Sequence, residues 1–364
     1  MENLSQQFSA SDMIIAGEAW PGWRRCQRDP QLPPIHYVTY QWTWPKRGRG
    51  YLRWLRWLAL PYVILRLVLL IRRWRCQTVV AVFPDDFYVI AAYWAGRLCG
   101  VPVYPYLHNT YLENVTGAGR LLAQWMQPRL FRDAPVVFVM SAGMRDYYQA
   151  KYPMARFEPL PHTFNEPIPD FTEPPIPGHP LRLGLLGNLN QSNLDATRRV
   201  VHLVRDDADM KLSIYSGSGM LMYNKMDVVG ENVEIGPVPM DQVQSRLAEN
   251  DILIIPHGFV GGLTQVEYET IFPTRTIPCL ISGRPILAHT PPDCFFTRWL
   301  RQYDCAEIVD QADPGAIHRA LERLRTDAQR RSHLVQNALH AARQFHAPAV
   351  AAAFRQTLRE TAPS

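Results

Sequence analysis

The chain has 364 residues, of which 47% are hydrophobic and 20% charged, and its formal net charge is +5. This composition excludes a disordered chain and a fibrous repeat, and the length suggests about two domains. The six cysteines form no C-x-x-C pair, which excludes zinc-ribbon and thioredoxin-type motifs and fits a reducing compartment. The polar N-terminus lacks the pattern of a signal peptide, so we expect a cytoplasmic protein.

Apolar runs alternate with helix-like stretches along the first half of the chain. Strands are predicted over 13–16, 36–40, 78–83, 101–107 and 136–140, and helices over 87–99 and 144–151. Such alternation is typical of an α/β fold with mostly parallel strands.

A basic and aromatic segment over 46–75 interrupts this pattern. It holds nine Lys and Arg residues, interleaved with Trp54, Trp57, Tyr62 and Trp74. Arginine and tryptophan favour the headgroup depth of a bilayer, so the segment predicts docking on an anionic membrane surface. An ordinary domain helix with a solvated basic face is the alternative. A true span is disfavoured because the longest uncharged run has nine residues and Pro61 is expected to break or kink the helix. No nucleic-acid-binding signature accompanies the segment, and we expect no nucleic-acid partner.

Eight prolines between 159 and 180 predict a linker over 161–180. A second α/β pattern follows, with strands over 181–186, 211–215, 233–235, 252–255 and 285–288 and helices over 193–204, 242–249, 276–282 and 295–302. The tail is helical from about 314. We therefore predict a first domain over 1–160, a second over 181–345, and a C-terminal helix over 346–364 that can return to the first domain. Ligands in such sheets bind beyond the carboxyl ends of the strands, so the cleft between two such domains is the expected site.

The stretch from Phe272 to Leu287 carries the most specific pattern. Thr274 is a good N-cap for a short helix, and Arg275 in its first turn adds a cation beside unpaired backbone N–H groups. A cation there is unfavourable to the helix itself but suits a bound diphosphate. The alternative is a simple capped helix with a surface arginine.

Residues 272–275 (FPTR) and 280–287 (LISGRPIL) resemble the F-P-[ST]-K and S-G-[KR]-P-I-L block of bacterial GT-B glycosyltransferases, including retaining enzymes of polysaccharide and glycolipid assembly. Residues 187–188, 215–219, 233–238 and 250–256 resemble further landmarks of that family in order. The resemblance implies an α/β GT-B fold with two Rossmann-like, doubly wound domains facing across a cleft. It also implies that the second domain binds a nucleotide sugar and the first binds a lipid-linked or polysaccharide acceptor.

Several residues are candidates for holding the donor. Glycine-rich turns at strand ends bring the backbone close to phosphate, and Arg275 and Thr276 can neutralise a leaving diphosphate without a metal or other cofactor. Asp207 and Asp209 spell a D-x-D that we interpret as a solvated loop rather than a metal site. The donor-binding candidates are Gly187, Asn188, Ser216, Gly217, His257, Gly262, Thr274, Arg275 and Thr276.

The catalytic candidates are His108 and Glu269. His108 follows a predicted strand and can act as a base or orient the sugar, and Glu269 can contact sugar hydroxyls, although either can also be structural. With Asn109 and Glu113, His108 resembles the family's H-D-x-x-x-E motif, and Glu113 is a candidate to orient the histidine. Trp20 and Trp23 can line an acceptor pocket by stacking on sugars or prenyl chains, with core packing as the alternative. The acceptor-binding candidates are Trp20, Trp23, Asn109 and Glu113.

The chain departs from the family pattern at three places. Arg275 replaces the usual lysine, Asn109 replaces an aspartate, and the paired glutamates spaced E-x7-E are replaced by Thr270 and Pro278. The leading hypothesis is a metal-independent, retaining hexosyltransferase at the inner face of the cell membrane. The alternatives are a nucleotide-sugar epimerase or hydrolase and a non-catalytic partner subunit of a transferase. The base, the sugar, the acceptor and the oligomeric state stay open.

Overall fold

The computed structural model describes residues 2–19, 32–40, 56–115, 117, 119–217, 223, 225–260 and 264–362. The chain forms two compact units: unit 1 comprises residues 1–165 and 347–364, and unit 2 comprises residues 166–346. The boundary between them therefore lies within the predicted linker over 161–180, and the last helix belongs to unit 1.

Unit 1 is built on a four-stranded parallel sheet in the order β3-β4-β5-β6. Its strands are β3 (Val79–Phe83), β4 (Val103–Leu107), β5 (Val137–Val139) and β6 (Phe157–Pro159). The helices between them are α5 (Asp86–Cys99), α6 (Gly119–Asp133) and α7 (Ala142–Lys151), with the short 3₁₀ turn η3 (Leu112–Asn114) before α6. A separate parallel pair joins β1 (Ile15–Ala19) to β2 (Ile35–Tyr40), so the first strand begins two residues later than predicted.

Local signals explain where these helices begin and end. The Asp85 side chain accepts a hydrogen bond from the N–H of Phe87 at the start of α5, and Ser141 does the same for Met144 in α7. Gly100 ends α5 at a φ of 68°, a conformation that glycine adopts without strain.

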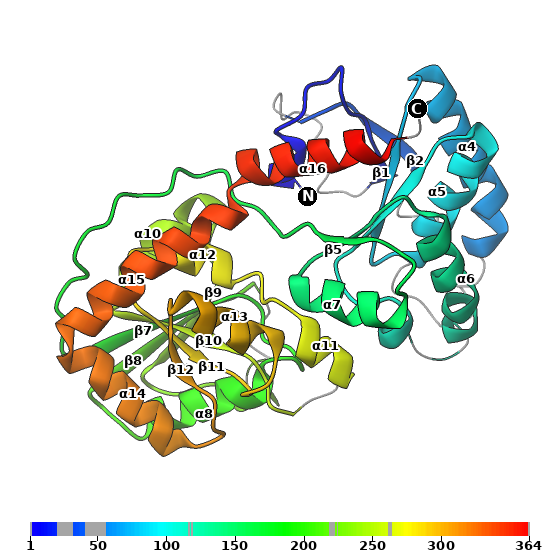
Figure 1. Ribbon diagram of the computed structural model, residues 1–364. Helices are drawn as coiled ribbons and strands as arrows, with labels where there is room; N and C mark the ends of the chain where they lie inside the picture. The colour runs from blue at the N-terminus through cyan, green and yellow to red at the C-terminus, as the bar shows by residue number, and fades with distance from the viewer. Residues whose placement is uncertain are drawn as a thin grey trace. The chain divides into compact units, whose positions relative to one another are not determined.

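The C-terminal helix completes the core of unit 1. In α16 (Ala347–Thr361), Val350, Ala351 and Phe354 pack with Tyr104 and Phe138 of the sheet. The same cluster includes Leu4 of the N-terminal helix α1 (Glu2–Ser5), which lies beside α16 in Figure 1. The two ends of the chain therefore meet in one hydrophobic core.

The described part of the basic segment forms the 3₁₀ turn η2 (Arg56–Ala59) and helix α4 (Leu60–Arg73). The expectation that Pro61 breaks or kinks the helix is wrong, because Pro61 lies in the first turn, where a missing N–H costs nothing. No helix in the described part of the chain is both long and apolar enough to cross a membrane.

Unit 2 is built on a six-stranded parallel sheet in the order β12-β11-β10-β7-β8-β9. The strands are β7 (Leu181–Leu186), β8 (Met210–Tyr215), β9 (Val233–Gly236), β10 (Ile252–Pro256), β11 (Ile286–His289) and β12 (Glu307–Val309). The helices are α8 (Leu194–Arg205), α10 (Val243–Ala248), α11 (Gln265–Thr270), α12 (Thr276–Leu280), α13 (Phe295–Tyr303), α14 (Pro314–Thr326) and α15 (Ala328–Ala342), with 3₁₀ turns η4 (Met240–Gln242) and η5 (Arg343–Phe345).

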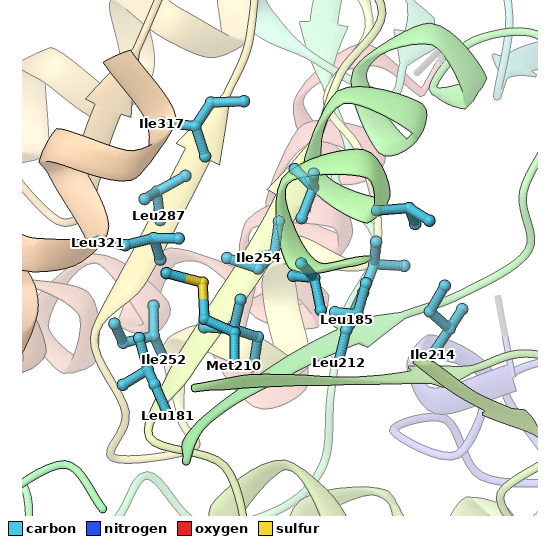
Figure 2. Close-up of a cluster of buried hydrophobic side chains, with 14 of the residues drawn as sticks. Leu181, Leu185, Met210, Leu212, Ile214, Ile252, Ile254, Leu287, Ile317 and Leu321 are labelled. Carbon is cyan, nitrogen blue, oxygen red and sulfur yellow. The ribbon is translucent and has the colours of Figure 1, made fainter. Parts of the chain in front are cut away.

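Aliphatic side chains of the sheet form the core of unit 2 against α8 and α14. Figure 2 shows Leu181, Leu185, Leu212 and Ile254 of the strands, with Ile317 of α14 directed toward them. Because both faces of a parallel sheet are covered, its strands are nearly continuous apolar runs, which is why β7 could be predicted to the residue.

Candidate functional site

The strand order of unit 2 fixes where a ligand can bind. From β7 the chain moves through β8 and β9 toward one edge of the sheet, and from β10 it moves through β11 and β12 toward the other. In such sheets the crevice lies at the carboxyl ends of the strands where the order reverses, here β7 and β10. Gly187 follows β7, Ser216 follows β8 and His257 follows β10, so these candidates line the same end of the sheet.

Four of the donor-binding candidates are brought together there. Gly187 has a φ of 102°, and a Cβ on it would lie 3.5 Å from Cζ of Arg275. Nη2 of Arg275 donates to the carbonyl oxygen of Asn188 at 3.1 Å, and Oγ of Ser216 donates to Oδ1 of Asn188 at 2.9 Å. The turn after β7 therefore packs against the arginine, and the absence of a side chain at Gly187 lets the backbone lie close to the guanidinium.

Two polar atoms at this point are buried without a partner among the described residues: Nη1 of Arg275 and Oγ1 of Thr276. Desolvation lowers the pKa of the Arg275 guanidinium to about 10, so the group stays charged at neutral pH. Arg275 is partly buried and has no counter-charge among the described residues, which is unfavourable, and an anion bound beside it would remove that penalty. The geometry therefore suits an anionic ligand with several acceptor oxygens.

The predicted cap of the short helix is wrong. α12 begins at Thr276, and Arg275 occupies the cap position with helical backbone angles of −60° and −19°. The N–H of Thr276 donates to the carbonyl of Pro273, so a backbone turn leads into the helix and no side chain caps it. Thr274 is exposed instead, and the helix ends at Leu280 rather than at 282.

His257 is buried and joins three elements. Nε2 of its ring lies 3.1 Å from the carbonyl oxygen of Tyr268 in α11, and the ring also hydrogen-bonds the thiol of Cys294, which precedes α13. Burial raises the pKa of Cys294, but the hydrogen bond and charge of His257 outweigh it and lower this pKa to about 6. The imidazole of His257 therefore links the end of β10 to α11 and to the start of α13.

A polar network that sequence reasoning missed lies beside it. Nε2 of His289 accepts a hydrogen bond from Nε of Arg199 at 2.9 Å, and its Nδ1 donates to the carbonyl of Val309 at 3.0 Å. Asp195 accepts from Arg199 at 2.9 Å and from the N–H of Phe259 at 3.0 Å. Only the i, i+4 spacing of Asp195 and Arg199 signalled the pair in the sequence. The network holds the loop after β10 against α8.

The carboxylate candidate Glu269 does not join the Arg275 cluster through any contact of the described residues. It is exposed on α11, where its Oε1 accepts from Nε2 of Gln265 at 3.0 Å. At the positions of the missing glutamates, the Thr270 hydroxyl donates to the carbonyl of Val266, and Pro278 offers only its own carbonyl, which accepts from Gln244. Gly262 lies outside the described residues, and a Cβ added to Gly217 would meet no atom within 4 Å.

In unit 1, His108 follows β4 as predicted and is largely buried. Its ring lies 4.4 Å from that of Tyr106 and 4.8 Å from that of His162, and its Nε2 is buried with no partner among the described residues. Burial, together with the charge that His162 can carry, lowers the pKa of His108 to about 3, and burial lowers that of His162 to about 4. Both imidazoles are therefore neutral at physiological pH.

The expectation that Glu113 orients His108 is wrong. Its carboxylate instead accepts from the hydroxyls of Tyr147 and Tyr148, at 3.2 and 3.0 Å, and pairs with Nζ of Lys151 at 2.5 Å. Burial raises the pKa of Glu113, but the lysine outweighs it and holds this pKa below its usual range. Asn109 is partly buried next to His108, whereas Trp20 and Trp23 lie outside the described residues.

Neither a protein-family model nor a curated protein matches this sequence. Solved structures do match. Anabaena Alr3699/HepE in complex with UDP and glucose has a TM-score of 0.67 at 12% identity, over 98% of this chain and 94% of that chain. A glycosyltransferase from Rickettsia africae ESF-5 has a TM-score of 0.64 at 11% identity, over 99% and 93%. The lipopolysaccharide outer core galactosyltransferase WaaB has a TM-score of 0.60 at 13% identity, over 96% and 99%. These neighbours are GT-B glycosyltransferases, and this α/β chain with its two Rossmann-like units shares their fold.

Proposed function

We propose that this protein is a glycosyltransferase that moves a sugar from a nucleotide-sugar donor to a lipid-linked or polysaccharide acceptor at the cytoplasmic face of the membrane. The observation that carries the proposal is the guanidinium of Arg275, whose buried Nη1 has no partner among the described residues and which is held beside the positive-φ Gly187 at the switch point of the sheet. The structural neighbours support it, since the Anabaena Alr3699/HepE structure is a complex with UDP and glucose.

Sugar transfer from such a donor requires the negative charge on the leaving diphosphate to be stabilised, and the cluster around Arg275 would do this. The bond between the anomeric carbon and the diphosphate oxygen breaks, a bond to an acceptor hydroxyl oxygen forms, and the hydroxyl proton passes to an oxygen of the departing diphosphate. Arg275, with the Thr276 hydroxyl, would stabilise the negative charge that develops on the diphosphate, so we propose that the reaction needs no metal. We propose a hexosyl donor and retention of configuration at the anomeric carbon.

A thermal-shift measurement tests the donor site. UDP, ADP and GDP are added to wild type, Arg275→Ala and Arg275→Lys, with Arg319→Ala, an exposed arginine of α14, as control. A nucleotide at about 100 times its Kd stabilises by about 2.7 kcal/mol, and we expect one of the three to do so. The shift should vanish in Arg275→Ala, persist in part in Arg275→Lys and remain whole in the control. A full shift in Arg275→Ala would contradict the proposed site.

One observation favours a second function, that of a non-catalytic partner subunit. Neither Thr270 nor Pro278 offers a carboxylate where the related glycosyltransferases carry their paired glutamates, and Glu269 is exposed. Sugar nucleotides incubated with lipid-linked acceptors separate the two functions. Transfer supports the enzyme, and NMR of the product's anomeric proton gives its configuration. Nucleotide binding without transfer, together with co-purification of an active transferase, supports the partner subunit.

A further inference from the structure

Helix α4 has an apolar face that nothing covers in the described part of the chain. Tyr62, Leu65 and Leu69 of α4 follow Leu58 of the preceding turn η2 at helical spacing, and the exposed fractions of Leu58, Tyr62, Leu65 and Leu69 are 79%, 51%, 56% and 54%. The opposite face, with Val63, Val68 and Ile71, packs on β2 and α5. A surface helix of a soluble domain is normally polar on its outer face, and a row of exposed apolar side chains marks an interaction surface.

The apolar row passes into a basic end on the same side of the helix. Arg72 and Arg73, three and four residues after Leu69, are exposed, as are Trp74 and Arg75. Arg66 stacks over the ring of Tyr62 at 5.9 Å and donates to its hydroxyl at 3.0 Å. Aromatic rings and arginine stems next to aliphatic side chains suit the boundary between lipid headgroups and acyl chains.

The charge along the chain selects the partner. Residues 30–84 contain nine Lys and Arg residues and no Asp or Glu. Because the whole chain carries +5 and this stretch carries +9, the remaining residues carry −4. In the described part of the stretch, Arg56 pairs with Asp85, whereas Arg66, Arg72, Arg73 and Arg75, on and just after α4, form no ion pair with another described residue. A second copy docked face to face would bring two such basic ends together, whereas an anionic surface complements them.

Helix α5, which lies beside α4, also exposes large apolar side chains. α5 packs along α4, as Figure 1 shows, and it exposes Trp94 and Leu98, whereas Arg97 between them pairs with Asp133 at 2.9 Å. The α4 row from Leu58 to Leu69 runs about 16 Å at 1.5 Å per residue, so a helix lying flat would bury all four side chains at once. A spanning orientation is not needed for this contact.

We propose that this surface, the α4 face (Leu58, Tyr62, Leu65, Leu69, Arg72 and Arg73), lays unit 1 on an anionic lipid bilayer with α4 parallel to the membrane plane. The apolar row enters the headgroup boundary, and the arginines bind lipid phosphates. The inference rests on the proposed function only in that a lipid-linked acceptor gives the docking a purpose.

Vesicle flotation tests it. Wild type is mixed with vesicles of phosphatidylcholine alone or with about 30 mol % phosphatidylglycerol, at low salt and at about 0.5 M NaCl. The test variants are Leu65→Gln with Leu69→Gln, and Arg72→Gln with Arg73→Gln. Matched controls from unit 2 are Ile176→Gln with Met240→Gln, which are 86% and 88% exposed, and Arg319→Gln with Arg343→Gln.

We expect wild type and both controls to float with anionic vesicles and much less with neutral ones. The arginine pair should lower the partition coefficient about thirtyfold at low salt and little at high salt. The leucine pair should lower it at both salt concentrations. Unchanged flotation of both test variants, or no flotation of wild type, would overturn the proposal. Light scattering that shows wild type dimeric and the leucine variant monomeric would assign the face to a second copy instead.

The UDP, ADP and GDP thermal shifts of the same proteins separate this proposal from the glycosyltransferase proposal. A retained nucleotide shift with no flotation overturns the membrane surface alone. Flotation without a nucleotide shift overturns the donor site alone.

Discussion

Arg275 of unit 2 and His108 of unit 1 show that burial lowers the pKa of two candidate residues with different consequences. Desolvation lowers the pKa of Arg275 to about 10, which leaves the cation intact at neutral pH. Burial lowers the pKa of His108 to about 3, which leaves its ring neutral and makes it a weak base. We therefore expect His108 to serve by hydrogen bonding through its unpartnered Nε2, which is the orienting role rather than that of a base.

Gly187→Ala should weaken nucleotide binding and lower stability together. The φ of 102° is unfavourable for any side chain, and the new Cβ would lie 3.5 Å from the Arg275 guanidinium. We expect a loss of about 1–3 kcal/mol in the free energy of unfolding, measured by urea denaturation, and a smaller nucleotide-induced thermal shift. Gly217→Ala is the matched stability control, because nothing lies within 4 Å of its added Cβ. Equal losses in the two variants would contradict this account.

His289 should make unit 2 sensitive to acid. Burial lowers its pKa to about 4, and its Nε2 can accept from Arg199 only while the ring is neutral. Unfolded histidine takes up a proton near pH 6.5, so between about pH 6.5 and 4 the unfolded state binds more protons and stability falls as the pH falls. This histidine contributes at most about 1.4 kcal/mol per pH unit. In His289→Gln, whose amide can keep both hydrogen bonds, urea denaturation between pH 7 and 5 should show a shallower loss, and an unchanged slope would refute the assignment.

Part of the candidate site was predictable from residues alone. Gly187, Asn188 and Ser216 follow predicted strands, and parallel strands place their carboxyl ends at one edge. The Asp195–Arg199–His289 network was not predictable, because it depends on which strands are neighbours. The role expected of Glu113 failed because its partners Tyr147, Tyr148 and Lys151 become neighbours only when α7 packs against the 3₁₀ turn that carries it.

At the scale of elements, the predictions were best where both faces of a strand are buried. β7 was predicted to the residue, and β8 and β10 to within one residue at one end. The three-residue strand β12 was missed because it is too short to show a pattern. α4 is continuous through Pro61 because proline is tolerated in the first turn of a helix. Whether a proline breaks a helix therefore depends on its position in that helix, which the residue type alone does not reveal.

Helix α16 completes the core of unit 1 although unit 2 separates it from the rest of unit 1 in the sequence, and this assignment can be tested. Phe354 is 2% exposed and packs edge-on against Phe138, with ring centroids 4.9 Å apart. Phe354→Ala should lower the free energy of unfolding of unit 1 by about 3–5 kcal/mol. Two calorimetric transitions are expected, of which the variant lowers one and a bound nucleotide raises the other. A variant that lowers only the nucleotide-sensitive transition would contradict the assignment of α16 to unit 1.

For the whole molecule, the α/β class with two Rossmann-like units is confirmed, because alternating strand and helix patterns leave few other folds. The uneven distribution of charge is also a property of the whole chain. All of the positive excess lies in residues 30–84, so the overall charge of +5 understates how basic one part is.

Unit 1 is discontinuous in the sequence, and this affects how the protein can fold during its synthesis. Residues 166–346 form unit 2 without help from either end of the chain. Residues 347–361, which supply Val350 and Phe354 to the core of unit 1, are translated after the whole of unit 2. The ribosome therefore releases a complete unit 2 while the sheet of unit 1 still lacks its final helix, and the domain that is begun first is the one finished second.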